Sequence, residues 1–536
     1  MANQLPRVAY FCMEYGLDNA FKQYAGGLGI LAGDTLKGAR DNGLPMVGVG
    51  LRWKQGYTDQ RIGPDGKPYD AFHNYEYPWL KDTGVTVTVR IRDNDVRAKV
   101  WLCDHFGNAP LYLLDTDIPG NPDAWITGQL YGWFGEERVA QEMILGIGGV
   151  RALQALGIPV DIYHFNEGHA ALAGLELIRQ KMAAGASFHE AWEATRRQVV
   201  FTTHTPVPEG NESHPIERLL YMGANLGLTV DQLVQIGGSP FNMTVAGLRL
   251  AKCANGVSQL HGETANRMWQ GVEGRCEIRA ITNGIHRPTW VDPRMRGPFA
   301  SPDDLWAAHM AVKRETIDFI ARKTGVRFDP EKLLIGFSRR AAPYKRSDLI
   351  FRCEEQVRSL LEEGKIQIVF SGKAHPLDDT GKRIVQHLVA MARRYPRSVA
   401  FIENYDMEVG AALTRGCDVW LNNPRRPQEA CGTSGMKAAM NGVLNASILD
   451  GWWPEAAQHG VNGWVIGDDV VPASVAEQDE RDAAALARVL LEEIVPTYYH
   501  NRPKWLAMMR ASIESTWERF SVDRMLKEYW ERLYMA

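Results

Sequence analysis

Short, continuously apolar runs alternate with helical stretches in both halves of the chain. In the first half these runs lie at residues 8–12, 46–51, 162–165 and 199–203, and in the second half at 333–337, 366–370, 399–402 and 419–421. Such strands, when separated by helices, are typical of parallel sheets that are covered on both faces. The sequence therefore predicts an α/β fold with doubly wound, Rossmann-like sheets.

The length and a proline-rich segment predict how these elements divide into domains. At 536 residues the chain exceeds the roughly 250–300 residues at which a single core stops growing. Residues 287–298 contain three prolines and no periodicity, which is typical of a connection. We expect one domain at 1–286 and a second at 287–536, whose C-terminal helices pack back on the first. Ligands of doubly wound sheets bind at the carboxyl ends of the strands, so we expect a central cleft that both domains face.

Composition excludes several classes of protein. The formal charge of -4 gives no electrostatic basis for binding nucleic acid or a membrane surface. The seven cysteines form no CxxC pair and are odd in number, which favours a reducing compartment over a disulfide framework or a zinc site. The N-terminus has no apolar signal core, and no run approaches the roughly 20 apolar residues of a membrane span. We expect a cytoplasmic protein without a metal.

Lys437 follows a loop rich in glycine, serine and threonine and lies where a helix is expected to begin. Small residues let the backbone approach a ligand closely, and the free N–H groups of a helix start attract anions. A lysine held there can form a Schiff base with an aldehyde cofactor. The alternative is a glycine-rich turn that carries an exposed lysine.

Two further segments are candidates for binding an anion. Arg339, Arg340, Lys345 and Arg346 follow the strand at 333–337, and these cations would repel one another unless an anion lay between them. A solvated basic turn remains the alternative. The glycines around Gly26 and Gly27 follow the first strand and open a helix, which suits either a phosphate or a tight turn.

Polar residues at the expected strand ends complete the candidates. His204 and the segment 164–169 give neither a zinc motif nor a nucleophile triad. Asn283 lies near the expected domain junction and either bonds a ligand hydroxyl or makes a turn. Trp452 and Trp453 are expected in the core rather than on a sugar.

Beside the run at 429–442, which contains Lys437, the chain has distinctive runs at residues 8–15, 26–34, 164–169, 201–208, 241–244, 255–263, 281–284, 344–346, 371–376 and 421–427. Taken together, these runs make the chain resemble the α-glucan (glycogen, starch and maltodextrin) phosphorylases, especially their shorter bacterial and archaeal branch. The run at 429–442 is the most specific, because it carries the cofactor lysine of that family. The resemblance implies a GT-B type glycosyltransferase architecture.

The resemblance also implies roles for individual residues. Lys437 would link to pyridoxal 5'-phosphate, and Arg340 and Lys345 would hold the substrate phosphate. The other cofactor contacts would be Gly26, Gly27, Thr433, Arg339, Tyr405 and Trp290. The sugar hydroxyls would be held by His204, Asn283, Glu429 and the loop amides near Gly432. Glu14 would be a cleft carboxylate whose role stays unspecified.

The reaction implied is reversible phosphorolysis of an α-1,4-glucan or maltooligosaccharide by orthophosphate, which gives α-D-glucose 1-phosphate with retention. Three alternatives remain: a retaining nucleotide-sugar glycosyltransferase, a catalytically silent glucan-binding protein, and a phosphorylase with a non-standard acceptor. Residues 131–136 depart from the Gly-Asp-Arg type pattern of the branch, and Ala140 stands where a basic residue is expected. This departure leaves the acceptor open, and the sequence does not decide whether the chain forms a homodimer.

Overall fold

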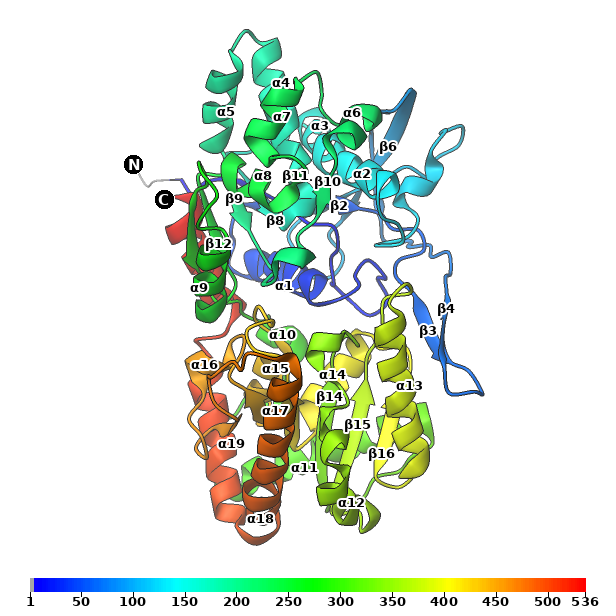
Figure 1. Cartoon of the computed structure of the whole chain (residues 1–536), viewed down its shortest axis with the longest axis vertical. Helices are drawn as coiled ribbons and strands as arrows, with labels where there is room; N and C mark the ends of the chain where they lie inside the picture. The colour runs from blue at the N-terminus through cyan, green and yellow to red at the C-terminus, as the bar shows by residue number, and fades with distance from the viewer. Residues whose placement is uncertain (1–3) are drawn as a thin grey trace. The chain divides into compact units, whose positions relative to one another are not determined.

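The computed structural model describes residues 4–536, which divide into two compact units (Figure 1). Unit 1 comprises Met1–Tyr57, Phe72–Asn283 and Val522–Ala536, and unit 2 comprises Thr58–Ala71 and Gly284–Ser521. Among residues 4–536, no helix combines the length and apolar character that crossing a membrane requires. Each unit is described by itself below.

Unit 1 is built on a nine-stranded sheet whose first seven strands run parallel. In sheet order the strands are β13 (Glu277–Ala280), β12 (Cys253–Gly256), β9 (Val199–Thr202), β8 (Ile162–Asn166), β1 (Val8–Phe11), β2 (Met46–Leu51), β7 (Leu111–Asp115), β6 (Asn94–Cys103) and β5 (Lys81–Ile91). β6 and β5 add to the edge in antiparallel fashion. β5 buries every second residue from Val87 to Ile91, so the predicted strand with one solvated face is confirmed.

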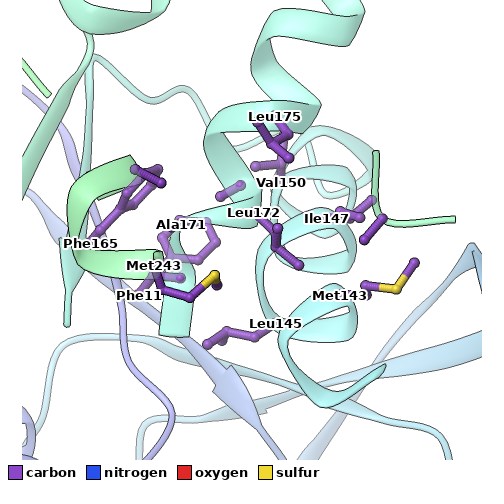
Figure 2. Packing of buried hydrophobic residues seen from close by; sticks show 14 of the residues in the cluster. Phe11, Met143, Leu145, Ile147, Val150, Phe165, Ala171, Leu172, Leu175 and Met243 are labelled. Carbon is purple, nitrogen blue, oxygen red and sulfur yellow. The ribbon is translucent and has the colours of Figure 1, made fainter. Parts of the chain in front are cut away.

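Helices cover this sheet and enclose its core. They are α1 (Gly27–Asp41), α2 (Glu136–Met143), α3 (Gly149–Ala155), α4 (Leu172–Ala183), α5 (Phe188–Arg196), α6 (Ile216–Met222), α7 (Val230–Gly237), α8 (Met243–Leu250), α9 (Gln259–Met268) and α20 (Val522–Tyr529). A short ribbon of β10 (Ser213–His214) and β11 (Phe241–Asn242) joins them. Figure 2 shows part of the core, where Phe11 and Phe165 meet edge to face with their ring centroids 6.2 Å apart.

The C-terminal segment Val522–Ala536 belongs to unit 1 and packs against its first helix. A Cβ on Gly38 of α1 would lie 2.6 Å from a methyl carbon of Val522 in α20. Lys252 reaches the same segment by donating to the carbonyl of Tyr534 at 2.8 Å. A residue larger than glycine at position 38 would therefore push the two helices apart.

Unit 2 contains a six-stranded sheet in which every strand runs parallel. Its order is β16 (Val399–Ile402), β15 (Ile366–Ser371), β14 (Leu333–Ser338), β17 (Val419–Asn422), β18 (Leu444–Ile448) and β19 (Gly463–Ile466). The first strand, β14, lies between β15 and β17, so the order reverses on its two sides. Ligands of such sheets bind beside this reversal, at the carboxyl ends of the strands.

The helices of unit 2 alternate with these strands, as Figure 1 shows for α12 beside β15 and α13 beside β16. They are α10 (Arg287–Trp290), α11 (Pro302–Thr324), α12 (Glu354–Glu362), α13 (Asp379–Arg394), α14 (Met407–Gly416), α15 (Ser434–Met440), α16 (Trp453–Ala456), α17 (Val475–Val489), α18 (Val495–His500) and α19 (Arg502–Thr516). The prediction of an α/β fold with doubly wound parallel sheets is confirmed in both units.

Two segments lie differently from the expected domain layout. The hairpin of β3 (Asp59–Ile62) and β4 (Pro68–Ala71) is part of unit 2, where the backbone N–H of Ile62 donates to Glu403 at 2.8 Å. Residues 287–298, expected as a connection, are packed into unit 2, since the side-chain amide of Asn441 donates to the carbonyl of Trp290 and accepts from the N–H of Asp292. The chain passes from unit 1 to unit 2 at Asn283–Gly284 instead.

A fully buried ion pair joins α11 to the sheet of unit 2. Asp418, directly before β17, accepts from Lys313 at 2.6 Å and contacts His309 at 2.7 Å, and none of the three side chains is appreciably exposed. Burial by itself raises the pKa of Asp418, but Lys313 and His309 outweigh burial and lower it. The carboxylate therefore stays charged inside the unit.

Asp418→Asn is expected to lower the free energy of unfolding by about 3–5 kcal/mol, because it leaves the Lys313 ammonium buried without its counter-ion. Urea denaturation followed by tryptophan fluorescence measures the loss. The matched control is Glu514→Gln in the exposed pair with Arg510, which should cost less than about 1 kcal/mol. Equal effects of the two substitutions would contradict the role of Asp418.

Candidate functional site

Lys437 lies inside unit 2 rather than on a solvated turn. Its side chain is in the fourth position of α15, the residue is only 6 % exposed, and its ammonium lies 3.7 Å from the centroid of the Trp290 ring. This arrangement excludes the alternative of an exposed lysine. A cation placed over an aromatic face is attracted by the negative face of the ring.

The loop before α15 depends on small residues. Gly432 has φ of +76°, in the left-handed region that favours glycine. A Cβ on Gly435 would lie 2.7 Å from the indole nitrogen of Trp452, so α15 approaches Trp452 too closely for a larger residue. Trp452 and Trp453 are both buried, which confirms that they are core aromatics.

The basic turn after β14 surrounds a carboxylate of its own chain. Glu429 accepts from Arg339 at 2.7 Å and from Lys345 through the same oxygen, Oε2. Arg346 is instead paired with Asp479 and Asp482. The sequence required an anion between these cations, and in this structure Glu429 occupies that place.

The electrostatics of Glu429 follow from these contacts. Burial by itself raises the pKa of its carboxyl, but Arg339 and Lys345 outweigh burial and lower the pKa to about 2. Arg340, by contrast, is exposed and lies beside the Tyr344 hydroxyl at 3.4 Å. The site thus combines an internal ion pair with an outward-facing guanidinium.

Two polar residues that follow neighbouring strands hold this arrangement and were not predicted. Asn422, at the end of β17, accepts from Arg339. Asp450, after β18, accepts from the backbone N–H of Glu429 at 2.9 Å, and burial raises its pKa to about 8. Their position in the sequence could have identified them, because each lies at or just after the carboxyl end of a strand of the parallel sheet, where ligands bind.

Of the remaining predicted residues in unit 2, Gly432 and Thr433 lie in the loop that follows Glu429. A Cβ on Gly432 would lie 3.4 Å from Glu429 and 3.5 Å from Arg339. Thr433 ends the same loop, and its carbonyl accepts from the N–H of Lys437. Tyr405 is half-buried, and burial raises the pKa of its hydroxyl to about 12 while nearby Arg339 partly opposes the shift. Unit 2 therefore brings Arg339, Lys345, Glu429 and Gly432 together.

In unit 1 the glycine loop is held by Glu14. One oxygen of Glu14 accepts from the backbone N–H groups of Ala25, Gly26 and Gly29 at 3.1, 2.9 and 2.9 Å. The N–H of Gly26, expected to face a phosphate, is therefore used by Glu14. No atom of residues 4–536 lies within 4 Å of a Cβ placed on Gly26 or Gly27, so the outer side of this loop is open to a ligand.

His204 and Asn283 also lie in unit 1. Nε2 of His204 is 2.6 Å from the side-chain oxygen of Asn166, and burial lowers the pKa of the imidazole to about 3, so it is neutral at pH 7. Asn283 is buried, and within residues 4–536 its side-chain oxygen has no hydrogen-bond partner. A buried acceptor without a partner is costly, and a ligand hydroxyl would satisfy it.

A separate cluster in unit 1 has the residue types of a metal site. Glu142, Glu212 and His214 place their ligand atoms within 4.8 Å of one another. Nε2 of His214 lies 3.1 Å from an oxygen of each carboxylate. Burial lowers the pKa of this imidazole, but the two carboxylates outweigh burial and raise it to about 9. The proton on His214 thus takes the position that a cation would occupy.

Comparison with known proteins places this chain in a family. Residues 300–459 match the family model described as carbohydrate phosphorylase. A maltodextrin phosphorylase of Thermococcus litoralis is 40% identical over 98% of this chain and 70% of its own length. The chain belongs to the carbohydrate phosphorylase family. The resemblance inferred from the sequence motifs is confirmed.

Two other relatives of this family span nearly the whole chain. A glycogen phosphorylase of Mycobacterium tuberculosis is 37% identical over 99% of this chain and 71% of its own length. A glycogen phosphorylase of Aquifex aeolicus is 35% identical over 98% of this chain and 86% of its own length. Both units of this chain are therefore covered by these matches.

Proposed function

We propose that this chain is an α-glucan phosphorylase that converts an α-1,4-glucan and orthophosphate reversibly into α-D-glucose 1-phosphate with retention. The observation that carries the proposal is the buried amine of Lys437, in the same unit as the cluster of Arg339, Lys345 and Glu429. Lys437 and the small-residue loop before it have no purpose in a nucleotide-sugar transferase. The names of the relatives, maltodextrin and glycogen phosphorylase, support the substrate class.

Pyridoxal 5'-phosphate is the cofactor of the proposed reaction, and the residues present fit it. Lys437 offers a buried amine against the face of Trp290, and the small residues before α15 leave its loop free of bulky side chains. The other residues proposed to hold the cofactor are Gly26, Gly27, Arg339, Tyr405, Thr433 and Trp290. When bound, the cofactor supplies a phosphate whose second pKa, near 6, suits proton exchange at neutral pH.

The side chains of this site then act by binding and orientation. Arg340 and Lys345 hold orthophosphate, which protonates the glycosidic oxygen and attacks the anomeric carbon from the face that the glucan leaves. Lys345 is already oriented by Glu429, so little side-chain entropy is lost when the anion arrives. His204, Asn283, Glu429, Glu14 and the amide of Gly432 are proposed to contact the sugar. The free side-chain oxygen of Asn283 supports this role.

The test is a direct assay of the purified protein supplied with pyridoxal phosphate. Maltoheptaose and orthophosphate should yield glucose 1-phosphate, and glucose 1-phosphate with maltooligosaccharides should release phosphate. Omitting orthophosphate is the control and should leave the glucan intact. Transfer from a nucleotide sugar, or binding of glucan without turnover, would contradict the proposal.

The free cysteines support a proposal for the cellular compartment of this protein. All seven are free thiols and all are buried. Reduced thiols are typical of cytosolic proteins. We therefore place the reaction in the cytoplasm.

A further inference from the structure

Unit 1 presents an aromatic surface that the proposed chemistry does not use. The rings of Trp125 and Trp133 lie nearly parallel, with an interplanar angle of 12° and centroids 5.9 Å apart. Trp125 is 37 % exposed, Trp133 is half-buried, and the neighbouring Phe134 is 59 % exposed. Parallel rings at this separation are offset, so the pair forms a stepped flat surface rather than a closed stack.

Hydrogen bonds hold the Trp125 ring in place. The indole nitrogen of Trp125 donates to Asp123 at 3.3 Å. Asp123 in turn accepts from Asn94 at 3.2 Å and lies 3.5 Å from the guanidinium of Arg92. The orientation of Trp125 is therefore fixed by buried and half-buried polar groups, not by the aromatic contact alone.

The loop that carries Trp133 is also held in place, by side-chain contacts and by its backbone conformation. The guanidinium of Arg138 lies 5.3 Å from the Tyr131 ring and 5.4 Å from the Phe134 ring. Tyr131 and Gly135 both have positive φ, at +58° and +67°, which bends the chain on either side of Trp133. A surface whose rings are oriented before binding loses little conformational entropy when a ligand arrives.

We propose that Trp125 and Trp133 form a docking platform for an α-glucan chain, in which a glucose ring lies on the indole faces. The proposal rests on the proposed function, which makes a polymeric glucan the substrate of this chain. A pyranose ring has a flat face of C–H groups that packs on an indole, and hydroxyls at its edge that seek polar partners. Asp123 is itself buried, but the part-exposed guanidinium of Arg92, 3.5 Å from it, can serve those hydroxyls.

The size of the surface favours a sugar over a protein partner. A stable protein interface buries at least about 1,000 Å² in total, whereas an aromatic side chain covers about 150–250 Å². Two indoles and one phenyl ring match a few glucose units. The part-exposed guanidinium of Arg92 near this surface further distinguishes it from an apolar protein-docking patch.

The experiment is affinity electrophoresis of the full chain in gels with and without soluble starch, together with kinetics on maltoheptaose. Trp133→Ala is expected to reduce the retardation and to weaken the apparent affinity for starch about tenfold, with Trp125→Ala acting in the same direction. In the kinetics KM for the glucan should rise while kcat stays unchanged. Trp133→Phe keeps an aromatic face and should restore most of the affinity.

The matched control is Tyr69→Ala, which removes an exposed aromatic ring from the hairpin of unit 2 and should leave retardation unchanged. Thermal melting checks that each variant is folded. Wild-type retardation without turnover, lost in Trp133→Ala, would support the platform while refuting the phosphorylase proposal. Turnover by the wild type with equal retardation of wild type and Trp133→Ala would overturn the platform and leave the phosphorylase proposal intact.

Discussion

Lys437→Ala is expected to abolish phosphorolysis, with a loss of more than about 1000-fold in the rate of glucose 1-phosphate release. The proposed cofactor would lose its covalent anchor, and a catalytic group that is not held in place forfeits most of its effective concentration. Two measurements report the result: the phosphate-dependent release of glucose 1-phosphate, and the absorbance of bound cofactor. Borohydride reduction followed by peptide mapping should place the adduct on Lys437 in the wild type.

Lys437→Arg is the sharper version of this experiment. Arginine keeps a positive charge and can stack on the Trp290 ring, but it does not condense with an aldehyde. This variant should therefore stay folded and remain inactive, which separates covalent anchoring from the packing of a buried cation. Lys504→Ala, at an exposed position at the start of α19, should leave both cofactor and activity intact. Full activity of Lys437→Arg, or an adduct on a different lysine, would refute the assignment.

Local patterns were enough to predict the strands and the kind of fold. The apolar runs at 333–337 and 366–370 became β14 and β15, because a strand buried on both faces is apolar at nearly every position. The alternation at 85–91 likewise identified β5. Each of these signals lies within a single element, and no distant part of the chain is needed to interpret it.

Pairings between distant segments could not be predicted in the same way. Glu429 binds Arg339 and Lys345, which are 90 and 84 positions away, and nothing in the basic turn itself shows that a carboxylate of the same chain will neutralise it. The use of the Gly26 N–H by Glu14 is a similar case. In both, a bond that a ligand was expected to make is made by the protein.

The assignment of segments to units failed for a related reason. Residues 287–298 have three prolines and no periodicity, yet Asn441 and Arg415 bind the carbonyl of Trp290 and fix the segment in unit 2. The hairpin of β3 and β4 joins the same unit through Glu403 and the carbonyl of Ala374. The composition of a segment predicts its local conformation. The unit to which it belongs is determined by these hydrogen bonds to distant side chains.

The second large effect is expected at the anion clamp. Lys345→Ala should lower kcat/KM for orthophosphate about 30- to 1000-fold, since a charge-assisted contact that tightens in the transition state contributes about 2–4 kcal/mol. Bound cofactor, measured by absorbance, should change little. Lys365→Ala, which removes a half-exposed lysine at the start of β15, serves as the control and should keep phosphate kinetics unchanged. Arg340→Ala is expected to act like Lys345→Ala.

Lys345 also pairs with Glu429, so its contribution to stability must be separated from its proposed role in binding orthophosphate. Its loss leaves the buried carboxylate of Glu429 with one cation fewer, and this destabilises unit 2 independently of any substrate. Glu429→Gln removes that buried charge but leaves the buried Arg339 without its carboxylate, so the double variant is not expected to regain the stability lost in Lys345→Ala, as measured by thermal melting. Its use of orthophosphate should stay impaired, because the cation that binds the anion is still missing. Recovery of phosphate kinetics in the double variant would mean that Lys345 serves only to neutralise Glu429, and the proposed clamp would then be wrong.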